Sequence, residues 1–217
     1  MEFWHNRWKS QQTGWHRAEY NDLLVKHWPS IGAEAHGEVL VPLCGKSLDM
    51  VWLAEQGHTI VGLEMVEQAV ETFFQEQGLE TESAMLGQHT KHVHPPFTLF
   101  QGDVFDLKPN TVQADAWYDR AAMVALPHES REAYVRQLQQ QTKPGAVGLL
   151  ITFSYPHGER QGPPFSLQDE HVLDLFSEGF TVERLETLEL EDEKEPGGSS
   201  PSTSVFKIKR TSRQKER

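Results

Sequence analysis

The sequence is poor in the features that build disulfides, membrane spans and nucleic-acid-binding surfaces. Its 217 residues include one cysteine, Cys44, so no disulfide can form within the chain. No uninterrupted apolar run approaches the ~18 residues that a membrane-spanning helix needs. Lys and Arg number 20 against 32 Asp and Glu, and phosphate contacts need clustered basic side chains. We therefore expect a small-molecule partner, and neither a nucleic acid nor a membrane.

The chain also lacks any linker-like stretch that would divide it into two halves. Its first residues do not show the basic and then apolar pattern of a secretory signal. The length suits one large domain. We expect a monomeric, cytoplasmic protein with a single domain over residues 1–210 and a basic, disordered tail over residues 211–217.

Segments with strand character alternate with segments of helical period along most of the chain. Residues 80–96 are polar and lack a clear period, so we predict that they are mostly loop. Helices are expected at residues 19–28, 48–56, 66–77, 129–141 and 167–176. Strands are expected at residues 39–41, 59–63, 97–101, 114–119, 146–153, 180–190 and 204–209. This order predicts an α/β fold, namely a doubly wound, seven-stranded, mostly parallel sheet with helices on both faces and an antiparallel edge.

One segment carries more functional information than any other. Residues 39–47 read Val-Leu-Val-Pro-Leu-Cys-Gly-Lys-Ser, a short apolar strand followed by a tight loop, and Ser47 can cap the next helix. The second strand leads to Glu64, 19 residues after Gly45. In a strand-helix-strand unit this spacing places a carboxylate beside a ribose. The pattern predicts a cofactor that contains adenosine, bound beyond the carboxyl ends of the strands.

Three cofactor classes compete for this loop, and its glycines distinguish them. The phosphate-binding loop of kinases and ATPases needs a glycine five residues before Gly45, where the chain has Leu40. A dinucleotide needs the pattern Gly-x-Gly-x-x-Gly, of which only Gly45 is present. S-adenosylmethionine carries no phosphate, so one glycine can suffice, and we favour this cofactor. Its expected contacts are Leu43 and Gly45 at the methionine part, Glu64 at the ribose, and Asp103 and Val104 beside the adenine.

Several motifs make the chain similar to a known enzyme family. They are Trp4-His-Asn-Arg-Trp8, Thr13-Gly-Trp-His16, Val41-Pro-Leu-Cys-Gly-Lys-Ser47, Asp119-Arg-Ala-Ala-Met-Val124 with Leu126-Pro127, and Gly162-Pro-Pro-Phe165. Over residues 1–210 the chain resembles the thiopurine S-methyltransferases of the bacterial type.

The resemblance implies a class I methyltransferase fold, S-adenosylmethionine as cofactor and S-adenosylhomocysteine as product. It implies that Trp8, Leu43, Glu64 and Arg120 contact the cofactor, and that Trp15 faces both cofactor and substrate. The implied acceptors are thiopurines and other small aromatic or heterocyclic thiols. Inorganic selenium or tellurium species such as tellurite are further implied acceptors, in detoxification.

Methyl transfer from a sulfonium cation to a thiolate destroys charge, so it is favoured where water is excluded. Trp4, Trp8 and Trp15 can supply a lid, formed by about residues 1–30, because aromatic faces exclude water and attract a sulfonium. A packed N-terminal helix is the other interpretation of these tryptophans, and both can hold together.

Arg120 is the catalytic candidate, because a guanidinium can stabilise an anionic acceptor and lower the pKa of a nearby thiol. Its alternative role is a surface ion pair with its neighbour Asp119. A heterocyclic thiol ionises readily near neutral pH, so no dedicated base is required. His16 is the one proton acceptor we nominate, and a structural role is favoured for it.

Other features have simpler interpretations. His89, His92 and His94 could suggest zinc, but the chain has one cysteine and this segment is expected to be a loop, so we predict no metal. Cys44 is interpreted as a small packing residue in the cofactor loop. The resemblance implies a further arginine, late in the chain, that holds the acceptor, whereas between Arg184 and Lys207 this sequence offers only Lys194. A cofactor-binding module without turnover is the alternative function.

Overall fold

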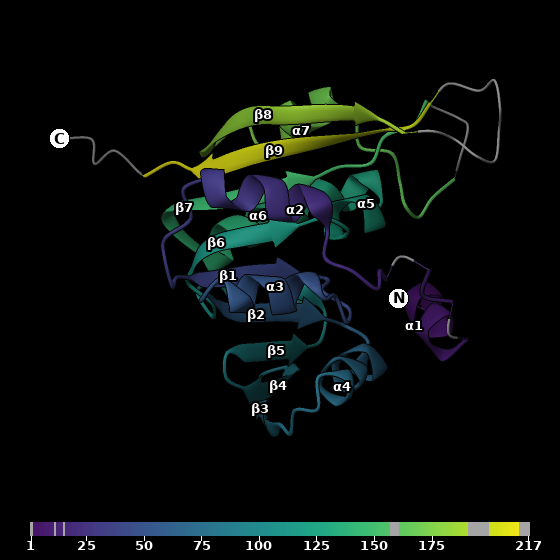
Figure 1. The fold of residues 1–217 in the computed structure, drawn as a ribbon, viewed down its shortest axis with the longest axis vertical. Helices are drawn as coiled ribbons and strands as arrows, with labels where there is room; N and C mark the ends of the chain where they lie inside the picture. The colour runs from purple at the N-terminus through teal and green to yellow at the C-terminus, as the bar shows by residue number, and fades with distance from the viewer. Residues whose placement is uncertain (1, 11, 15, 157–160, 191–199, 213–217) are drawn as a thin grey trace.

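The computed structural model describes residues 2–10, 12–14, 16–156, 161–190 and 200–212, and Figure 1 shows how they are arranged. Within these residues the fold is a nine-stranded sheet with helices packed around it, in the strand order β3-β4-β5-β2-β1-β6-β7-β9-β8. The strands are β1 (Glu38–Pro42), β2 (Thr59–Glu64), β3 (Glu82–Leu86), β4 (His89–His94), β5 (Phe97–Gln101), β6 (Ala114–Asp119), β7 (Thr142–Ile151), β8 (Phe180–Glu189) and β9 (Ser202–Arg210).

The middle of the sheet is parallel and its edges are antiparallel. β5, β2, β1, β6 and β7 run in one direction, each paired with the next. β9 pairs antiparallel with β7 and β8, at the edge where the sequence predicts such a pair. Strands β1, β2 and β7 are rich in buried Val, Ile and Leu, as expected where both faces of a parallel sheet are covered. The prediction of an α/β fold is confirmed, with a mixed sheet that is mostly parallel in its core.

The prediction that residues 80–96 are mostly loop is wrong. This segment forms a hairpin of β3 and β4, which pairs antiparallel with β5 and adds two strands to the seven expected. A two-residue turn joins the two strands, and Gly87 supplies a positive φ of 62° in it. Every residue of β3 is exposed, so this edge strand is held by backbone pairing. Its sequence therefore has no alternation of buried and exposed residues that could reveal it.

Helices cover both faces of the sheet, over two apolar cores. One core contains side chains of α2, α3 and α4, and the other contains side chains of α5, α6 and α7. Neighbours along a strand alternate between the cores, as Trp117 and Tyr118 do in β6. The helices are α1 (Glu2–Lys9), α2 (Asp22–His27), α3 (Asp49–Glu55), α4 (Glu67–Glu76), α5 (Ala122–Ala125), α6 (Arg131–Gln141) and α7 (Asp169–Leu175). None of these helices combines the length and the apolar character that crossing a bilayer requires.

The parallel strands all end on one side of the sheet, which we call its carboxyl edge, and α1 lies beyond that side (Figure 1). There the chain continues from β1 into the loop of residues 43–47, from β2 into Met65 and from β6 into Arg120. Ligands of open α/β sheets bind at this edge, because the loops of neighbouring strands converge on it. The fold therefore brings candidate site residues from separate parts of the sequence together at the carboxyl ends of the strands.

Candidate active site

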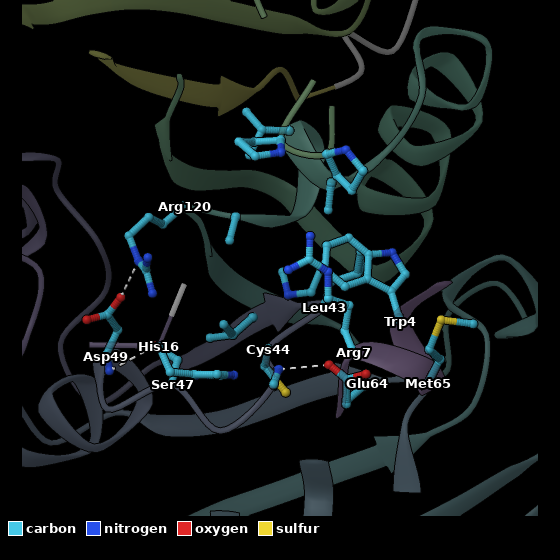
Figure 2. Close-up of a pocket in the computed structure, with 18 of the residues that line it drawn as sticks. Trp4, Arg7, His16, Leu43, Cys44, Ser47, Asp49, Glu64, Met65 and Arg120 are labelled. Carbon is cyan, nitrogen blue, oxygen red and sulfur yellow. Dashed lines mark hydrogen bonds and ion pairs between the residues drawn. The ribbon is translucent and has the colours of Figure 1, made fainter. Parts of the chain in front are cut away.

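A cavity of about 600 Å³ lies at the carboxyl edge of the sheet. Its walls come from α1, from the loop after β1, from the ends of β2 and β6, and from the region around residues 163–164. Figure 2 shows Arg120 and Asp49 at one end of this cavity and Glu64 and Met65 at the other. One end of the cavity therefore holds the ion pair of Arg120 and Asp49, and the other holds the Glu64 carboxylate.

The loop after β1 turns through two residues in the left-handed conformation, Leu43 with φ 47° and Gly45 with φ 53°. A Cβ added at Gly45 would lie 2.7 Å from Cε1 of His16, so a side chain is excluded there as well. Cys44 lies between them and is buried, and its Sγ would be 2.7 Å from a Cβ added at Gly62. Burial raises the pKa of the Cys44 thiol well above its usual range, which leaves it a packing group rather than a nucleophile.

Glu64 ends β2 at the cavity, and only 7% of this residue is exposed. Its Oε2 accepts a hydrogen bond from the Gly45 amide at 2.8 Å, and its Oε1 accepts one from the Val66 amide at 2.8 Å. Burial raises the pKa of Glu64, and these backbone hydrogen bonds oppose that rise. Each carboxylate oxygen has two lone pairs, so each can still accept a hydroxyl of a ligand. The arrangement suits the binding of a vicinal diol.

Arg120, the predicted catalytic residue, follows β6 at the other end of the cavity (Figure 2). Its side chain is 17% exposed, and its Nε donates a hydrogen bond to Oδ2 of Asp49 at 2.9 Å. Asp119, the alternative partner suggested by the sequence, is 1% exposed and accepts a hydrogen bond from the Tyr134 hydroxyl at 2.7 Å. Burial raises the pKa of Asp119 to about 6. The surface pairing of Arg120 with Asp119 is therefore the wrong alternative, because Asp119 is buried against Tyr134 and Arg120 pairs with Asp49.

Helix α1 supplies aromatic and cationic side chains to the cavity wall. Trp4, Arg7 and Trp8 are three and four residues apart, so they share one side of the helix, and all three line the cavity. Trp8 is 5% exposed and packs in one cluster with Val66, at the start of α4. Sequence reasoning missed Arg7, although its helical spacing with the two tryptophans was a usable signal. Trp15, predicted to face both cofactor and substrate, lies outside the residues that the structure describes.

His16 lines the cavity and packs against Trp8, with the two ring centroids 5.1 Å apart. Burial lowers the pKa of the His16 imidazole to about 4, and the positive charges of Lys46 and Arg120 act in the same direction. The imidazole is therefore neutral at pH 7 and a weak base. This weakens its candidacy as the proton acceptor.

Asp103 and Val104, predicted beside the adenine, are not among the described residues that line the cavity. Oδ1 of Asp103 accepts a hydrogen bond from the Phe105 amide at 2.9 Å. Val104 is 7% exposed, and its carbonyl accepts a hydrogen bond from Gln137 Nε2 at 2.7 Å. These contacts shape the turn after β5, and the adenine contact of this turn stays a prediction.

The three histidines of β4 lie along a strand, with two of them near backbone carbonyls. A ring nitrogen of His89 is 2.8 Å from the Asp103 carbonyl, and one of His94 is 2.6 Å from the Glu80 carbonyl. The described part of the chain contains no group of three or more His, Cys, Asp or Glu placed to hold a metal ion. Nothing in this geometry assigns a metal role to the histidines.

Sequence reasoning also missed Asp49 and part of the apolar wall. Asp49 is the first residue of α3, where acids are common because they face the positive end of the helix dipole, so nothing in the sequence distinguishes it. Pro163 and Pro164, from the Gly-Pro-Pro-Phe motif, line the cavity together with Phe153. The predicted site residues Trp8, Leu43, Gly45, Glu64 and Arg120 line it as well.

Comparison with known sequences finds one family over almost the whole chain. The model of the family described as thiopurine S-methyltransferase (TPMT) matches residues 1–215. The thiopurine S-methyltransferase of Shewanella pealeana is 46% identical over 187 residues, which cover 84% of each chain. That of Shewanella amazonensis is 45% identical over 186 residues, which cover 85% of each chain.

Comparison with solved structures finds methyltransferase folds at low sequence identity. A 1,6-didemethyltoxoflavin N1-methyltransferase of Burkholderia thailandensis, solved with its substrate and S-adenosylhomocysteine, aligns with a TM-score of 0.63 and 15% identity. The alignment covers 97% of this chain and 87% of that one. TehB of Haemophilus influenzae aligns with a TM-score of 0.63 and 12% identity over 95% of this chain and 66% of that one. At such identities the likeness concerns the fold alone.

Proposed function

Because this chain belongs to the thiopurine S-methyltransferase family, we propose that it transfers a methyl group from S-adenosylmethionine to the sulfur of small aromatic or heterocyclic thiols, with thiopurines as acceptors. Family and fold are those of a methyltransferase that depends on S-adenosylmethionine. The observation that carries the proposal is the position of Glu64. Its carboxylate is held 2.8 Å from the Gly45 amide at one end of the cavity that Arg120 lines at the other.

The residues near Glu64 fit S-adenosylmethionine. The carboxylate has lone pairs for the two ribose hydroxyls, and the left-handed turns at Leu43 and Gly45 expose backbone to the methionine part. The face of Trp8 attracts a sulfonium, with a contribution of ~0.5–2 kcal/mol. When bound, the cofactor supplies an electrophilic methyl group, and its product is S-adenosylhomocysteine. The further cofactor contacts in this proposal are Trp15, Asp103, Val104 and Arg120.

At the other end of the cavity, Arg120 stabilises the acceptor as an anion. A thiol beside a guanidinium ionises more readily, so its sulfur is present as the nucleophilic thiolate. Phe153, Pro163 and Pro164 line the cavity and exclude water, which favours a reaction in which opposite charges cancel. The same guanidinium suits inorganic selenium or tellurium anions. We include these species as acceptors, in a detoxifying role.

We further propose a lid at the N-terminus of a single domain of about residues 1–210. Of residues 1–30, which the sequence predicts as the lid, α2 carries Leu24, buried in a core of the sheet, so the lid we propose is α1 with the segment that follows it as far as Asn21. The support is the position of α1 beyond the carboxyl edge of the sheet, where Trp4, Arg7 and Trp8 line the cavity (Figure 1). A wall built from a separate N-terminal helix can move without disturbing the sheet. It can therefore admit both ligands and then exclude water from them.

The function is tested by incubating the protein with methyl-labelled S-adenosylmethionine and a thiopurine and following the label into the product. We expect label in the S-methylated thiopurine and formation of S-adenosylhomocysteine. Cofactor binding in calorimetry without transfer to a thiol, selenite or tellurite would instead support a binding module without turnover.

Gly45→Ala is expected to weaken the binding of S-adenosylhomocysteine. The new Cβ would collide with His16, and a left-handed alanine costs ~1–3 kcal/mol, so the loop shifts and the Gly45 amide leaves Glu64. Calorimetry measures the affinity. Gly32→Ala is the matched control, because Gly32 has φ 80° but open space around it. If both variants bind the product equally well, close packing at Gly45 has no role in the site.

The pH dependence of kcat/KM is expected to follow the ionisation of the acceptor thiol and not that of a protein base. With a pKa of about 4, His16 has no titration near neutral pH that could control activity. Two thiols of different pKa should therefore give profiles whose midpoints differ by the same amount. A midpoint that is the same for both thiols, and that disappears in His16→Asn, would identify His16 as the base.

A further inference from the structure

Asp49 lies between the cofactor loop and the proposed acceptor end of the cavity. It is the first residue of α3, two residues after Ser47, and it is 2% exposed. The hydroxyl of Ser47 accepts a hydrogen bond from the Asp49 amide at 3.2 Å, which ties the start of α3 to the cofactor loop. A carboxylate this deeply buried is stable only where donors satisfy it.

Three donors from two other segments meet the Asp49 carboxylate. Oδ1 accepts a hydrogen bond from the Asn21 amide at 2.9 Å. Oδ2 accepts one from the Tyr118 hydroxyl at 2.9 Å and one from Nε of Arg120 at 2.9 Å. Tyr118 lies in β6 and Arg120 directly follows that strand, and both side chains reach the same carboxylate oxygen. One carboxylate thus joins α3, the end of β6 and the segment that enters the fold at Asn21.

Arg120 donates its hydrogen bond to Asp49 from Nε, at the side of the guanidinium (Figure 2). A guanidinium carries five N–H donors in a fixed plane, so a bond at Nε sets the orientation of that plane and does not consume the terminal nitrogens. Arginine side chains are otherwise flexible. A guanidinium that is oriented before the ligand arrives loses less conformational freedom on binding.

We infer that Asp49 is a positioning residue of the methyl transfer: it holds the guanidinium of Arg120 in the orientation that meets the anionic acceptor. This inference rests on the proposed function. The same carboxylate binds the Asn21 amide, at the base of the N-terminal segment that carries α1. Asp49 therefore ties the acceptor-binding cation and the root of the proposed lid to one fixed point.

The test is a double-mutant cycle between Asp49→Asn and Arg120→Ala, measured as kcat/KM for a thiol acceptor. Asparagine keeps an oxygen for the Asn21 amide but removes the charge that holds Arg120. We expect Asp49→Asn to lower kcat/KM by about 10- to 100-fold, because small misplacements of reacting groups are costly. In the Arg120→Ala background the same substitution should have little further effect. Full additivity of the two losses would overturn the inference.

Asp169→Asn is the matched control, because Asp169 forms an ion pair with Arg184 at a similar distance, 2.8 Å, on the surface between α7 and β8. It should change kcat/KM by less than about twofold. If Asp49→Asn does not fold, Asp49→Glu keeps the charge and displaces the carboxylate by one methylene, and the same cycle applies to it. An Asp49→Glu loss that adds fully to that of Arg120→Ala would likewise overturn the inference.

A readout independent of turnover is the Nε–H resonance of Arg120 in ¹⁵N NMR spectra, assigned by its disappearance in Arg120→Lys. We expect it to be protected from exchange in the wild-type protein and to shift and exchange faster in Asp49→Asn. An active wild type whose Asp49→Asn variant has unchanged kcat/KM overturns the positioning role alone. A wild type that methylates no acceptor overturns the proposed function and this role with it, even if the resonance confirms the contact.

Discussion

Glu64→Ala is expected to weaken the binding of S-adenosylhomocysteine by ~1–3 kcal/mol, the cost of leaving buried hydrogen-bonding groups without partners. Two losses combine in this variant. The ribose hydroxyls lose their acceptor, and the amides of Gly45 and Val66 lose the oxygens that they contact at 2.8 Å. The loop that approaches the cofactor is then no longer tied to the end of β2. Isothermal titration calorimetry with S-adenosylhomocysteine measures the change.

The matched control for this prediction is Glu76→Ala. Glu76 is also a glutamate near the cofactor loop, but it is exposed and pairs with Lys46. Exposed pairs contribute little, so the affinity of this variant should stay within about twofold of the wild type. An affinity that Glu64→Ala leaves unchanged would remove Glu64 from the cofactor site, and with it the observation that carries the proposed function.

Arg120→Ala is expected to lower kcat/KM for thiol acceptors by about 10²- to 10³-fold, the usual cost of removing a group that stabilises developing or transferred charge in a site that excludes water. The free energy of unfolding should fall by less than the loss of a buried ion pair usually costs. Breaking a buried ion pair costs ~3–5 kcal/mol when the remaining charge has no other partner. Asp49 keeps two donors, the Asn21 amide and the Tyr118 hydroxyl, so its charge is not left without partners.

Steady-state kinetics and denaturant unfolding of the same preparation separate these two effects. Arg120→Lys is the informative companion variant, because it keeps the positive charge but has no Nε donor to be oriented by Asp49. We expect it to recover part of the lost kcat/KM. The catalytic role of Arg120 is contradicted if the alanine variant is partly unfolded and its folded fraction has the specific activity of the wild type.

Most of the sheet could be predicted because its central strands are covered on both faces. A strand such as β7 must be apolar along most of its length, and that requirement is visible in the sequence. The hairpin of β3 and β4 could not be predicted in the same way. Its outer strand is exposed throughout and depends on backbone pairing with a neighbour, and backbone pairing leaves little trace in side-chain composition.

The cofactor end of the site was predictable for a local reason. Gly45 and Glu64 are 19 residues apart and belong to one strand-helix-strand unit, whose adjacent parallel strands bring them together at the same edge. The sequence predicted the position of Arg120 but not the residue that pairs with it. Its place after β6 followed from the strand pattern, whereas its partner came from a residue 71 positions away in the chain.

By itself, then, the sequence determined the order of strands and helices, the glycine loop with its carboxylate, and the family motifs. These depend on local backbone sterics, on the periodicity of burial and on spacing within one supersecondary unit. Only the tertiary structure decided that Asp49 holds Arg120, that Arg7 and the tryptophans of α1 line the cavity, and that the half-buried His16 packs beside Gly45. Such contacts join residues far apart in the chain, and their energies depend on burial and orientation that exist only once the elements have packed.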